Sequence, residues 1–157
     1  MISLISIITP ETPIGRIMIT ANERYIVGIE LFLSDQYVDN ELTPPSHVQK
    51  LIDQLSHYFE HPHNEWDVSL SLHGTDFQQK IWQYLQTIPL GDSRSYSSIA
   101  AELNTSARAV GNACRANPFA IVIPCHRVVA KSGLGGYYGK IAGKELNVKQ
   151  WLLDHER

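Results

Sequence analysis

Cysteine is scarce in this sequence, since Cys114 and Cys125 are the only two among 157 residues. Two cysteines cannot build the disulfide framework of a small secreted domain, so we expect free thiols in a reducing compartment. We interpret the seven histidines as scattered, and no CxxC or HExxH spacing accompanies them. The sequence therefore predicts neither a metal site nor a cofactor.

Long hydrophobic runs are also missing. No apolar segment approaches the roughly 20 residues that a membrane-spanning helix needs. The apolar start, Ile2 to Ile8, follows no Lys or Arg and precedes no small-residue cleavage site, which argues against a secretory signal. We expect a cytoplasmic protein with no membrane partner.

Basic residues predominate in only one part of the chain, whose formal net charge is −3. Residues 1–72 contain three basic and ten acidic side chains, whereas residues 106–149 contain seven basic ones and a single acid, Glu145. The seven are Arg108, Arg115, Arg127, Lys131, Lys140, Lys144 and Lys149. This asymmetry favours one face for an anionic partner, although a solvated surface would give the same pattern.

The first half of the sequence has the pattern of a small sheet with one helix. Three β-branched and aliphatic runs, 2–9, 14–21 and 25–33, predict an antiparallel meander. A helix begins after Pro44-Pro45 and ends before Pro62, and Trp66 to Leu72 predicts one more strand. We place a domain boundary at His73-Gly74, which gives an N-terminal domain, 1–73, and a C-terminal domain, 74–157.

The second half is mainly helical. Thr75 or Asp76 caps a helix whose expected apolar face is Phe77, Ile81, Trp82 and Leu85. Ser95 caps a helix to about Leu103, Ser106 caps another from Ala107 to about Ala116, and a last helix ends near Glu156 with Val148, Trp151 and Leu152 as apolar positions. The middle pair has the spacing of a helix-turn-helix, a weak signal because helical cores also contain such pairs. The predicted class is α+β: an N-terminal sheet and helix packed on a mainly helical domain.

Cys125 stands out as a candidate nucleophile. It lies between an apolar stretch, Ile121 to Ile123, predicted as a buried strand, and a glycine-rich loop. The adjacent His126 and Arg127 would favour thiolate over thiol, whereas Cys114 is expected to be a buried small hydrophobe. Neighbouring side chains diverge, so we expect His126 to act through a water. Glu156 would reach His126 only if the last helix folds back.

The sequences IPCHRVV and RAVGNACRANP closely resemble those of the O6-alkylguanine-DNA alkyltransferases. The similarity covers about half the chain, in order, and includes Phe77-Gln78, Ile81-Trp82, Ser95-Tyr96 and Trp151 to Leu153. It implies repair of O6-alkylguanine by transfer of one alkyl group to Cys125, and it leaves open whether O4-alkylthymine is also a substrate. An S-alkyl thioether has no carbonyl for water to attack, so each molecule would act once.

The same resemblance implies roles for particular residues. Cys125 would accept the alkyl group, His126 with a bound water and Glu156 would form the proton relay, and Asn117 would brace the cysteine loop. Val128 and Tyr138 would line the guanine pocket. An insertion of about four residues after Tyr138 departs from the family pattern at the pocket rim.

Double-stranded DNA is the implied partner, bound by a monomer in the minor groove without sequence preference. Arg108 would fill the gap left by the flipped nucleotide, and Tyr96 would press on the rotating phosphate. Small residues such as Ala107 and Gly111 would allow close approach. Further DNA-backbone contacts are implied for Gln78, Ser97 and Lys131.

Three alternatives stay open on the residues alone. A thiol hydrolase would turn over an ester or peptide substrate repeatedly. An alkyltransferase-like binding protein would lack the cysteine, so Cys125 argues against it. A transcriptional regulator would bind one operator in the major groove.

Overall fold

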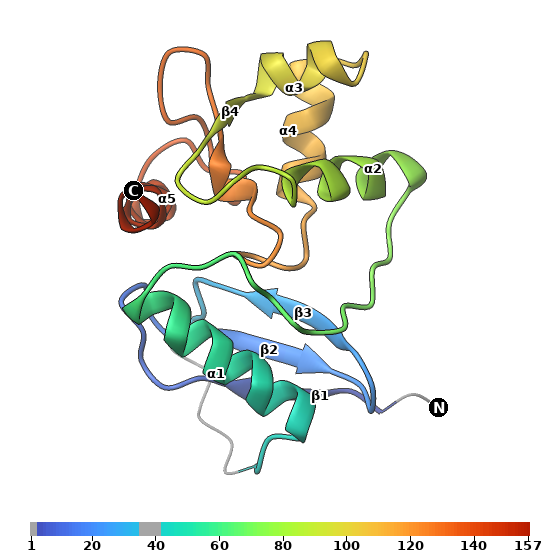
Figure 1. Cartoon of the computed structure of the whole chain (residues 1–157), viewed down its shortest axis with the longest axis vertical. Coiled ribbons are helices and arrows are strands. Elements are labelled where there is room, and N and C mark those ends of the chain that lie inside the picture. Colours follow the sequence, from blue (N-terminus) through green and yellow to red (C-terminus); the bar gives the residue numbers. More distant parts are fainter. Residues whose placement is uncertain (1–2, 35–41) are drawn as a thin grey trace. The chain divides into compact units, whose positions relative to one another are not determined.

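The computed structural model describes residues 3–34 and 42–157, which form two compact units (Figure 1). The first unit comprises residues up to Leu72 together with Pro118–Ala120. The second comprises His73–Asn117 and Ile121–Arg157.

The first unit contains the predicted antiparallel meander, in the order β1-β2-β3. Its strands are shorter than the apolar runs: β1 is Ile5–Ile8, β2 is Met18–Ala21 and β3 is Ile26–Glu30. Ile2, the first residue of the predicted first strand, lies outside the described residues. Ile7, Ile19 and Ile29 are paired in register and buried, so one row of isoleucines crosses the sheet.

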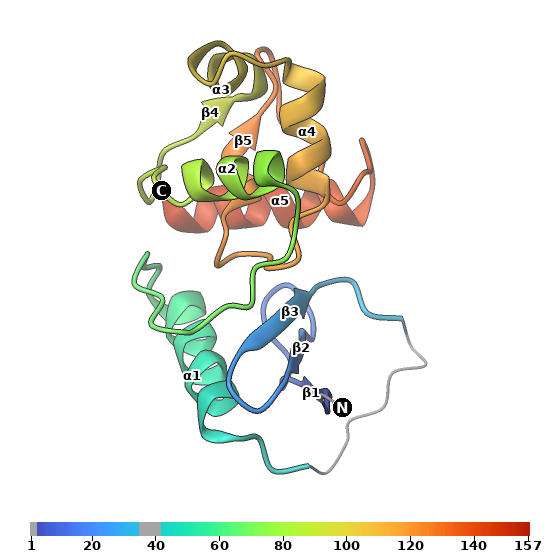
Figure 2. The same ribbon diagram turned by 90° about the vertical axis from the view of Figure 1, so that its right-hand side faces the viewer.

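The helix α1, Ser46–Glu60, lies along one face of this sheet (Figures 1 and 2). It begins directly after Pro44-Pro45, as predicted. Its buried positions recur at steps of three and four residues, which gives one apolar stripe: Val48, Leu51, Leu55 and Tyr58. The amphipathic helix predicted from the sequence is thus confirmed.

The predicted strand from Trp66 to Leu72 is wrong. This segment makes one parallel bridge, between Leu70 and Ile26. The free edge of β3 cannot accommodate a longer strand, because Phe119 pairs with Ile29 further along the same edge. The segment is held instead by side chains of α1: Gln54 bonds both backbone groups of Asp67.

The second unit contains four α-helices in its described residues: α2 (Asp76–Leu85), α3 (Tyr96–Glu102), α4 (Ala107–Arg115) and α5 (Lys144–Glu156). The predicted caps Thr75, Ser95 and Ser106 each accept a backbone N–H three residues on. The expected face of α2 is partly wrong. Ile81, Trp82 and Leu85 are buried, but Phe77 is exposed.

The segment before Cys125 is buried as expected but is not a strand. Residues 121–123 form a turn, with Ile121 at a φ of 73°. Pro118 and Pro124 lie on either side, and prolines without an N–H disfavour a paired strand. A 3₁₀ turn, η1 (Cys125–Arg127), follows and leads into β5 (Val128–Val129).

β5 pairs in parallel with β4 (Arg94–Ser95). Because β4 directly precedes α3, this short pair holds the cysteine turn beside the start of α3.

The apolar positions predicted for the last helix are confirmed in part, because Leu152 is buried. Val148 and Trp151 are half-buried, whereas Lys149, Leu152, Leu153 and Glu156 are buried. Gly91, at a φ of 86°, allows the end of α5 to come close, since a Cβ there would lie 3.1 Å from the Glu156 carbonyl oxygen. Across residues 3–34 and 42–157, no helix has both the length and the apolar character needed to cross a membrane.

Candidate active site

Cys125 opens the η1 turn and is 8% exposed. Its backbone N–H donates to the Ile123 carbonyl (2.8 Å), and the Asn117 amide donates to the same oxygen (2.8 Å). Burial raises the pKa of the Cys125 thiol, although a hydrogen bond from Asn117 and the charge of Lys149 act against this rise. The cation that lowers this pKa is Lys149 rather than the His126 and Arg127 expected from the sequence, and desolvation outweighs its effect.

His126 is fully buried beside Cys125 in the chain, and its Nε2 lies 2.8 Å from Glu156 Oε2. The last helix therefore does bring Glu156 to His126. Burial lowers the pKa of His126 despite the opposing effect of Glu156, so the imidazole is neutral. The hydrogen bond assigns the proton to Nε2, which leaves Nδ1 as an acceptor. Nδ1 is buried and has no hydrogen-bond partner among the described residues.

Arg127 is a buried partner of Glu156 that sequence reasoning missed. Its Nε donates to Oε1 (2.8 Å), one terminal nitrogen donates to Oε2 (3.0 Å), and the other donates to the Ile88 carbonyl (2.9 Å). The guanidinium and the carboxylate form a bidentate pair from which water is excluded. Successive residues of one tight turn, His126 and Arg127, thus hold the same carboxylate.

Lys149 is a second buried cation that sequence reasoning missed. Its Nζ donates to the carbonyls of Val128 (2.6 Å) and Gly136 (2.8 Å) and lies 5.7 Å from the centroid of the Tyr96 ring. Burial lowers the pKa of Lys149 to about 8. This lysine joins the strand after the cysteine turn to the glycine-rich loop. Its position one turn before the apolar pair Leu152-Leu153 was the available signal.

The basic residues of the 106–149 segment do not all lie on one exposed face. Arg127 and Lys149 do not belong to a basic face, because both are buried. The five other basic side chains of that segment are exposed: Arg108, Arg115, Lys131, Lys140 and Lys144.

The predicted pocket residues Val128 and Tyr138 differ in exposure. Val128 is fully buried in β5, while Tyr138 is exposed. Tyr138 and Gly139 form the tip of a two-residue turn, both at positive φ, closed by paired backbone bonds between Tyr137 and Lys140. Gly139 lies against Arg115 of α4, because a Cβ there would be 2.6 Å from the Arg115 Nε. The turn that carries Tyr138 is thereby held beside α4.

The residues suggested for DNA contact all lie in the second unit. Arg108 is exposed at the second position of α4, and Lys131 is exposed after β5. Tyr96 begins α3 and is half-buried, with its hydroxyl 3.4 Å from the Gly136 carbonyl. Ser97 is exposed and lies 3.2 Å from the Ser95 hydroxyl, and the Gln78 side chain accepts the Thr75 N–H. Gln78 is thus already used as a helix cap.

Cys114 is buried on α4, as expected, and burial raises the pKa of its thiol. It has no histidine beside it in the sequence, unlike Cys125. The two thiols therefore differ in their access to a base.

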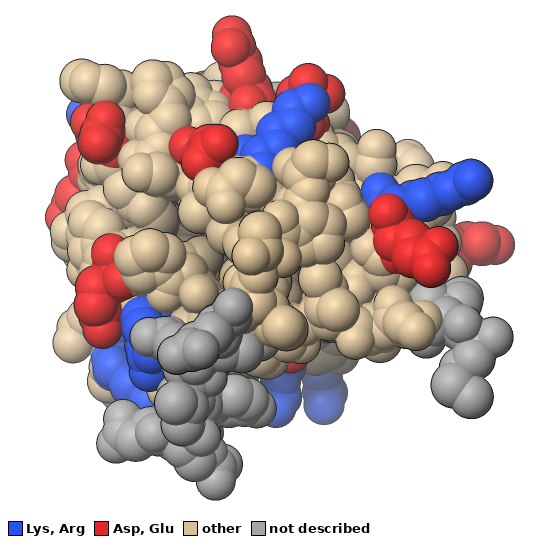
Figure 3. Space-filling model, turned by 90° about the horizontal axis from the view of Figure 1, so that it is seen from below, with Lys and Arg blue, Asp and Glu red and all other residues tan. Residues whose placement is uncertain are grey.

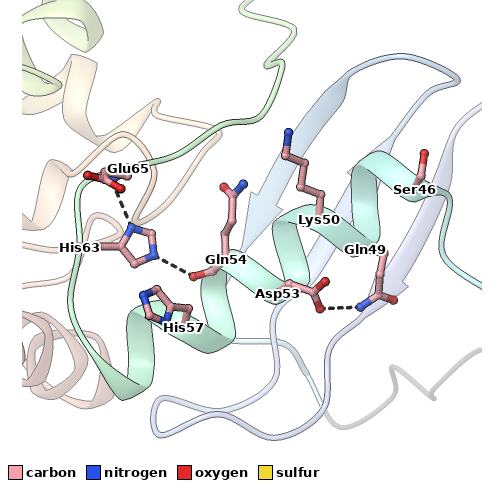
Figure 4. A pocket seen from close by; sticks show the side chains of 8 residues that line it. All are labelled: Ser46, Gln49, Lys50, Asp53, Gln54, His57, His63 and Glu65. Atoms are coloured by element: carbon pink, nitrogen blue, oxygen red, sulfur yellow. Dashed lines mark hydrogen bonds between the residues drawn. The ribbon is translucent and has the colours of Figure 1, made fainter.

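The first unit has a polar hollow of about 500 Å³ over the solvent side of α1 (Figure 4). Its lining comprises Ser46, Gln49, Lys50, Asp53, Gln54, His57, His63 and Glu65. On the face of this unit drawn in Figure 3, acidic and basic side chains are interspersed around an uncharged centre.

The histidines are less scattered than expected, because three lie together at the end of α1. The His57 ring centroid is 5.2 Å from that of His63 and 6.0 Å from that of His61. Both ring nitrogens of His63 are already hydrogen-bonded, to the Gln54 carbonyl and the Glu65 N–H. Within the described part of the chain, no group of three or more His, Cys, Asp or Glu is arranged to hold a metal ion.

The site around Cys125 combines a thiol, a neutral imidazole, a carboxylate and a cation in one buried cluster. Such a chain of groups can move a proton away from the sulfur and so prepare it for attack on an electrophilic carbon.

Comparison with known proteins places this site in a family. Residues 76–157 match the DNA-binding domain of 6-O-methylguanine DNA methyltransferase, and residues 5–72 match the ribonuclease-like domain of the same family. The chain is 41% identical to a methylated-DNA–protein-cysteine methyltransferase of Mycobacterium bovis, over 95% of this chain and 90% of that protein.

Two solved structures of similar proteins point to the same family. The Mycobacterium tuberculosis O6-methylguanine methyltransferase is 36% identical with a TM-score of 0.81, covering 98% of this chain and 93% of that one. M. tuberculosis OGT in complex with DNA is 39% identical with a TM-score of 0.77, covering 94% and 90%. The chain therefore belongs to the 6-O-methylguanine DNA methyltransferase family, and the resemblance and fold class inferred from the sequence are confirmed.

Proposed function

We propose that this protein repairs DNA by transferring one alkyl group, a methyl group in the simplest case, from the O6 atom of guanine to Sγ of Cys125. The observation that carries the proposal is the relay behind the thiol. His126 follows Cys125 in the chain. Its Nε2–H donates a hydrogen bond to Glu156, and its Nδ1 is left as a hydrogen-bond acceptor. Membership of the family supplies the reaction class.

The chemistry follows from these groups. Through a bound water, Nδ1 of His126 accepts the thiol proton, and Glu156 stabilises the imidazolium that forms. The thiolate attacks the alkyl carbon, the carbon–O6 bond breaks, and its electron pair stays on guanine, which takes up a proton. Asn117 holds the backbone before Cys125 and donates to the thiolate, which favours the ionised sulfur.

Each molecule acts once. The product is a thioether, which has neither a polarised carbonyl nor a good leaving group, so water does not regenerate the thiol. A thiol hydrolase, in contrast, would release its acyl group and turn over many times.

The partner is double-stranded DNA, bound by a monomer in the cytoplasm, through the minor groove and without sequence preference. α3, the turn after it and α4 form the binding element, supported by the exposure of Arg108 and the small residues Ala107 and Gly111 on α4. Flipping the damaged nucleotide costs a few kcal/mol, which insertion of Arg108 offsets in part.

In the proposed complex, other side chains contact the flipped nucleotide and the DNA backbone. Tyr96 presses on the rotating phosphate, and Val128 and Tyr138 line the guanine pocket. Ser97, Lys131 and Gln78 contact the backbone, Gln78 through donor groups that its capping bond leaves available.

Intact-protein mass spectrometry with a duplex that carries O6-methylguanine tests the proposal. We expect one added methyl group per molecule, located on Cys125, and no further addition with excess duplex. Cys125→Ser should remove no methyl group, whereas the matched variant Cys114→Ser should remain active. A methyl group on Cys114, or repair by Cys125→Ser, would refute the assignment.

A further inference from the structure

The positive charge of Arg127 is directed at Glu156 rather than at solvent. Two of its nitrogens hold the two carboxylate oxygens at 2.8 and 3.0 Å, and the third is fixed by the Ile88 carbonyl at 2.9 Å. The Arg127 and Glu156 side chains are each 1% exposed. A guanidinium stays protonated at all working pH values, so Glu156 always faces a positive charge.

We propose that Arg127 is a positioning residue that determines, through Glu156, which nitrogen of His126 carries the proton. The inference rests on the proposed role of Cys125 as the alkyl acceptor. It assigns Arg127 a function in the reaction although nothing places it against the substrate.

The protonation state of the Glu156 carboxyl group determines whether it can donate a hydrogen bond to His126. An ionised Glu156 can only accept, so its partner His126 must donate through Nε2, and Nδ1 is then free to receive the thiol proton. A protonated Glu156 could donate to Nε2 instead. The imidazole proton would then sit on Nδ1, and His126 could no longer act as a base toward Cys125.

Arg127 is the group that keeps Glu156 ionised. A buried carboxylate without a cation is strongly disfavoured and takes up a proton instead. His126 does not supply the charge, because its burial favours the neutral imidazole. The other buried cation, Lys149, donates to the carbonyls of Val128 and Gly136.

The first test uses the unaltered protein. In ¹⁵N-histidine NMR spectra at neutral pH, His126 should show a protonated Nε2 and an unprotonated Nδ1, with His126→Gln used to assign its signals. A protonated Nδ1 in the wild-type protein would overturn the proposal, and this test does not depend on the folding of an Arg127 variant.

The second test follows the single-turnover rate against pH. Arg127→Met should lower the rate about 100-fold at neutral pH, as expected for loss of a general base. The rate should recover at higher pH, where Glu156 ionises without its partner. Arg127→Lys keeps the charge but loses the bidentate geometry, so its rate should lie between those of Arg127→Met and the wild type.

A double-mutant cycle separates positioning from packing. In a Glu156→Gln background, where no carboxylate remains to be held, Arg127→Met should change the rate by less than about twofold. If instead Arg127→Met lowers the rate by the same factor at every pH and in both backgrounds, Arg127 serves only the packing, and the proposal fails.

The choice of substrate separates this inference from the proposed function. The same variants are assayed with free O6-benzylguanine, which needs no DNA binding, and with the O6-methylguanine duplex. Failure of the proposed function would leave Cys125 unalkylated in the wild-type protein. Failure of the Arg127 inference would leave wild-type transfer intact and the NMR or pH result contrary to expectation.

Discussion

The two units bury different kinds of side chain. Among the described residues of the first unit, Thr9 is the one buried polar residue in a core of aliphatic and aromatic side chains. Among its described residues, the second unit buries four polar or charged side chains: His126, Arg127, Lys149 and Glu156. Burying ions is costly unless they are paired with good geometry. The first unit is thus organised for stability, and the second gives up some stability to hold a reactive site.

The largest effect on stability is expected for Glu156→Ala. It leaves Arg127 buried without its carboxylate, which typically costs about 3 kcal/mol in the free energy of unfolding. The single-turnover rate should fall about 100-fold as well, because His126 loses the group that orients it. Urea unfolding and methyl transfer from a duplex measure the two effects.

Glu60→Ala is the matched control for that change. Glu60 is an exposed glutamate at the end of α1, so its removal should alter the free energy of unfolding by less than about 0.5 kcal/mol. If both variants lost the same free energy of unfolding, the buried charges of the second unit would matter no more for stability than an exposed charge of the first.

The sequence was sufficient to predict the helices and the family. Periodic apolar positions predicted α1, capping residues predicted the starts of α2, α3 and α4, and the order of motifs around Cys125 predicted the family. These features depend on local spacing, which a sequence displays directly.

The predictions that are wrong concern features that depend on contacts between segments distant in the sequence. Whether Leu70 continues as a strand depends on Phe119, which occupies the rest of the β3 edge. Arg127 and Lys149 resemble surface cations until the fold places carboxylate or carbonyl oxygens around them. For the same reason, the sequence does not show that burial raises the pKa of the Cys125 thiol.

Lys149→Met tests the second buried cation through its pH dependence. Burial lowers the pKa of Lys149 to about 8, so above this pH the folded protein binds fewer protons than the unfolded chain, where a lysine titrates near 10.4. The contribution of Lys149 to the free energy of unfolding therefore increases as the pH rises from about 8 to about 10.4. Methionine does not titrate, so the stability of the wild type relative to Lys149→Met should increase by about 2 kcal/mol between pH 7.5 and 10.

Urea unfolding of both proteins at several pH values measures this difference. Lys50→Met is the control, because Lys50 is a half-exposed lysine on α1 that pairs with Asp67. The difference in free energy of unfolding between Lys50→Met and the wild type should stay nearly constant across these pH values. A constant difference for Lys149→Met as well would contradict the assignment of a depressed pKa to a charged, buried lysine.

The smallest effect on stability, but a clear one on repair, is expected for Arg108→Ala. Arg108 is exposed on α4, so its removal should change the free energy of unfolding by less than about 0.5 kcal/mol. Transfer from duplex DNA should slow by about 10-fold, because in the proposed complex Arg108 fills the gap that the flipped nucleotide leaves in the duplex. Reaction with free O6-benzylguanine, which involves no flipping, should be unaffected.

The matched control is Arg24→Ala, because Arg24 is an exposed arginine of the first unit. This variant should leave both rates unchanged. Equal slowing of the duplex and free-base reactions in Arg108→Ala would mean that this arginine supports the site itself, which would extend the functional region of the second unit from its buried cluster to its surface.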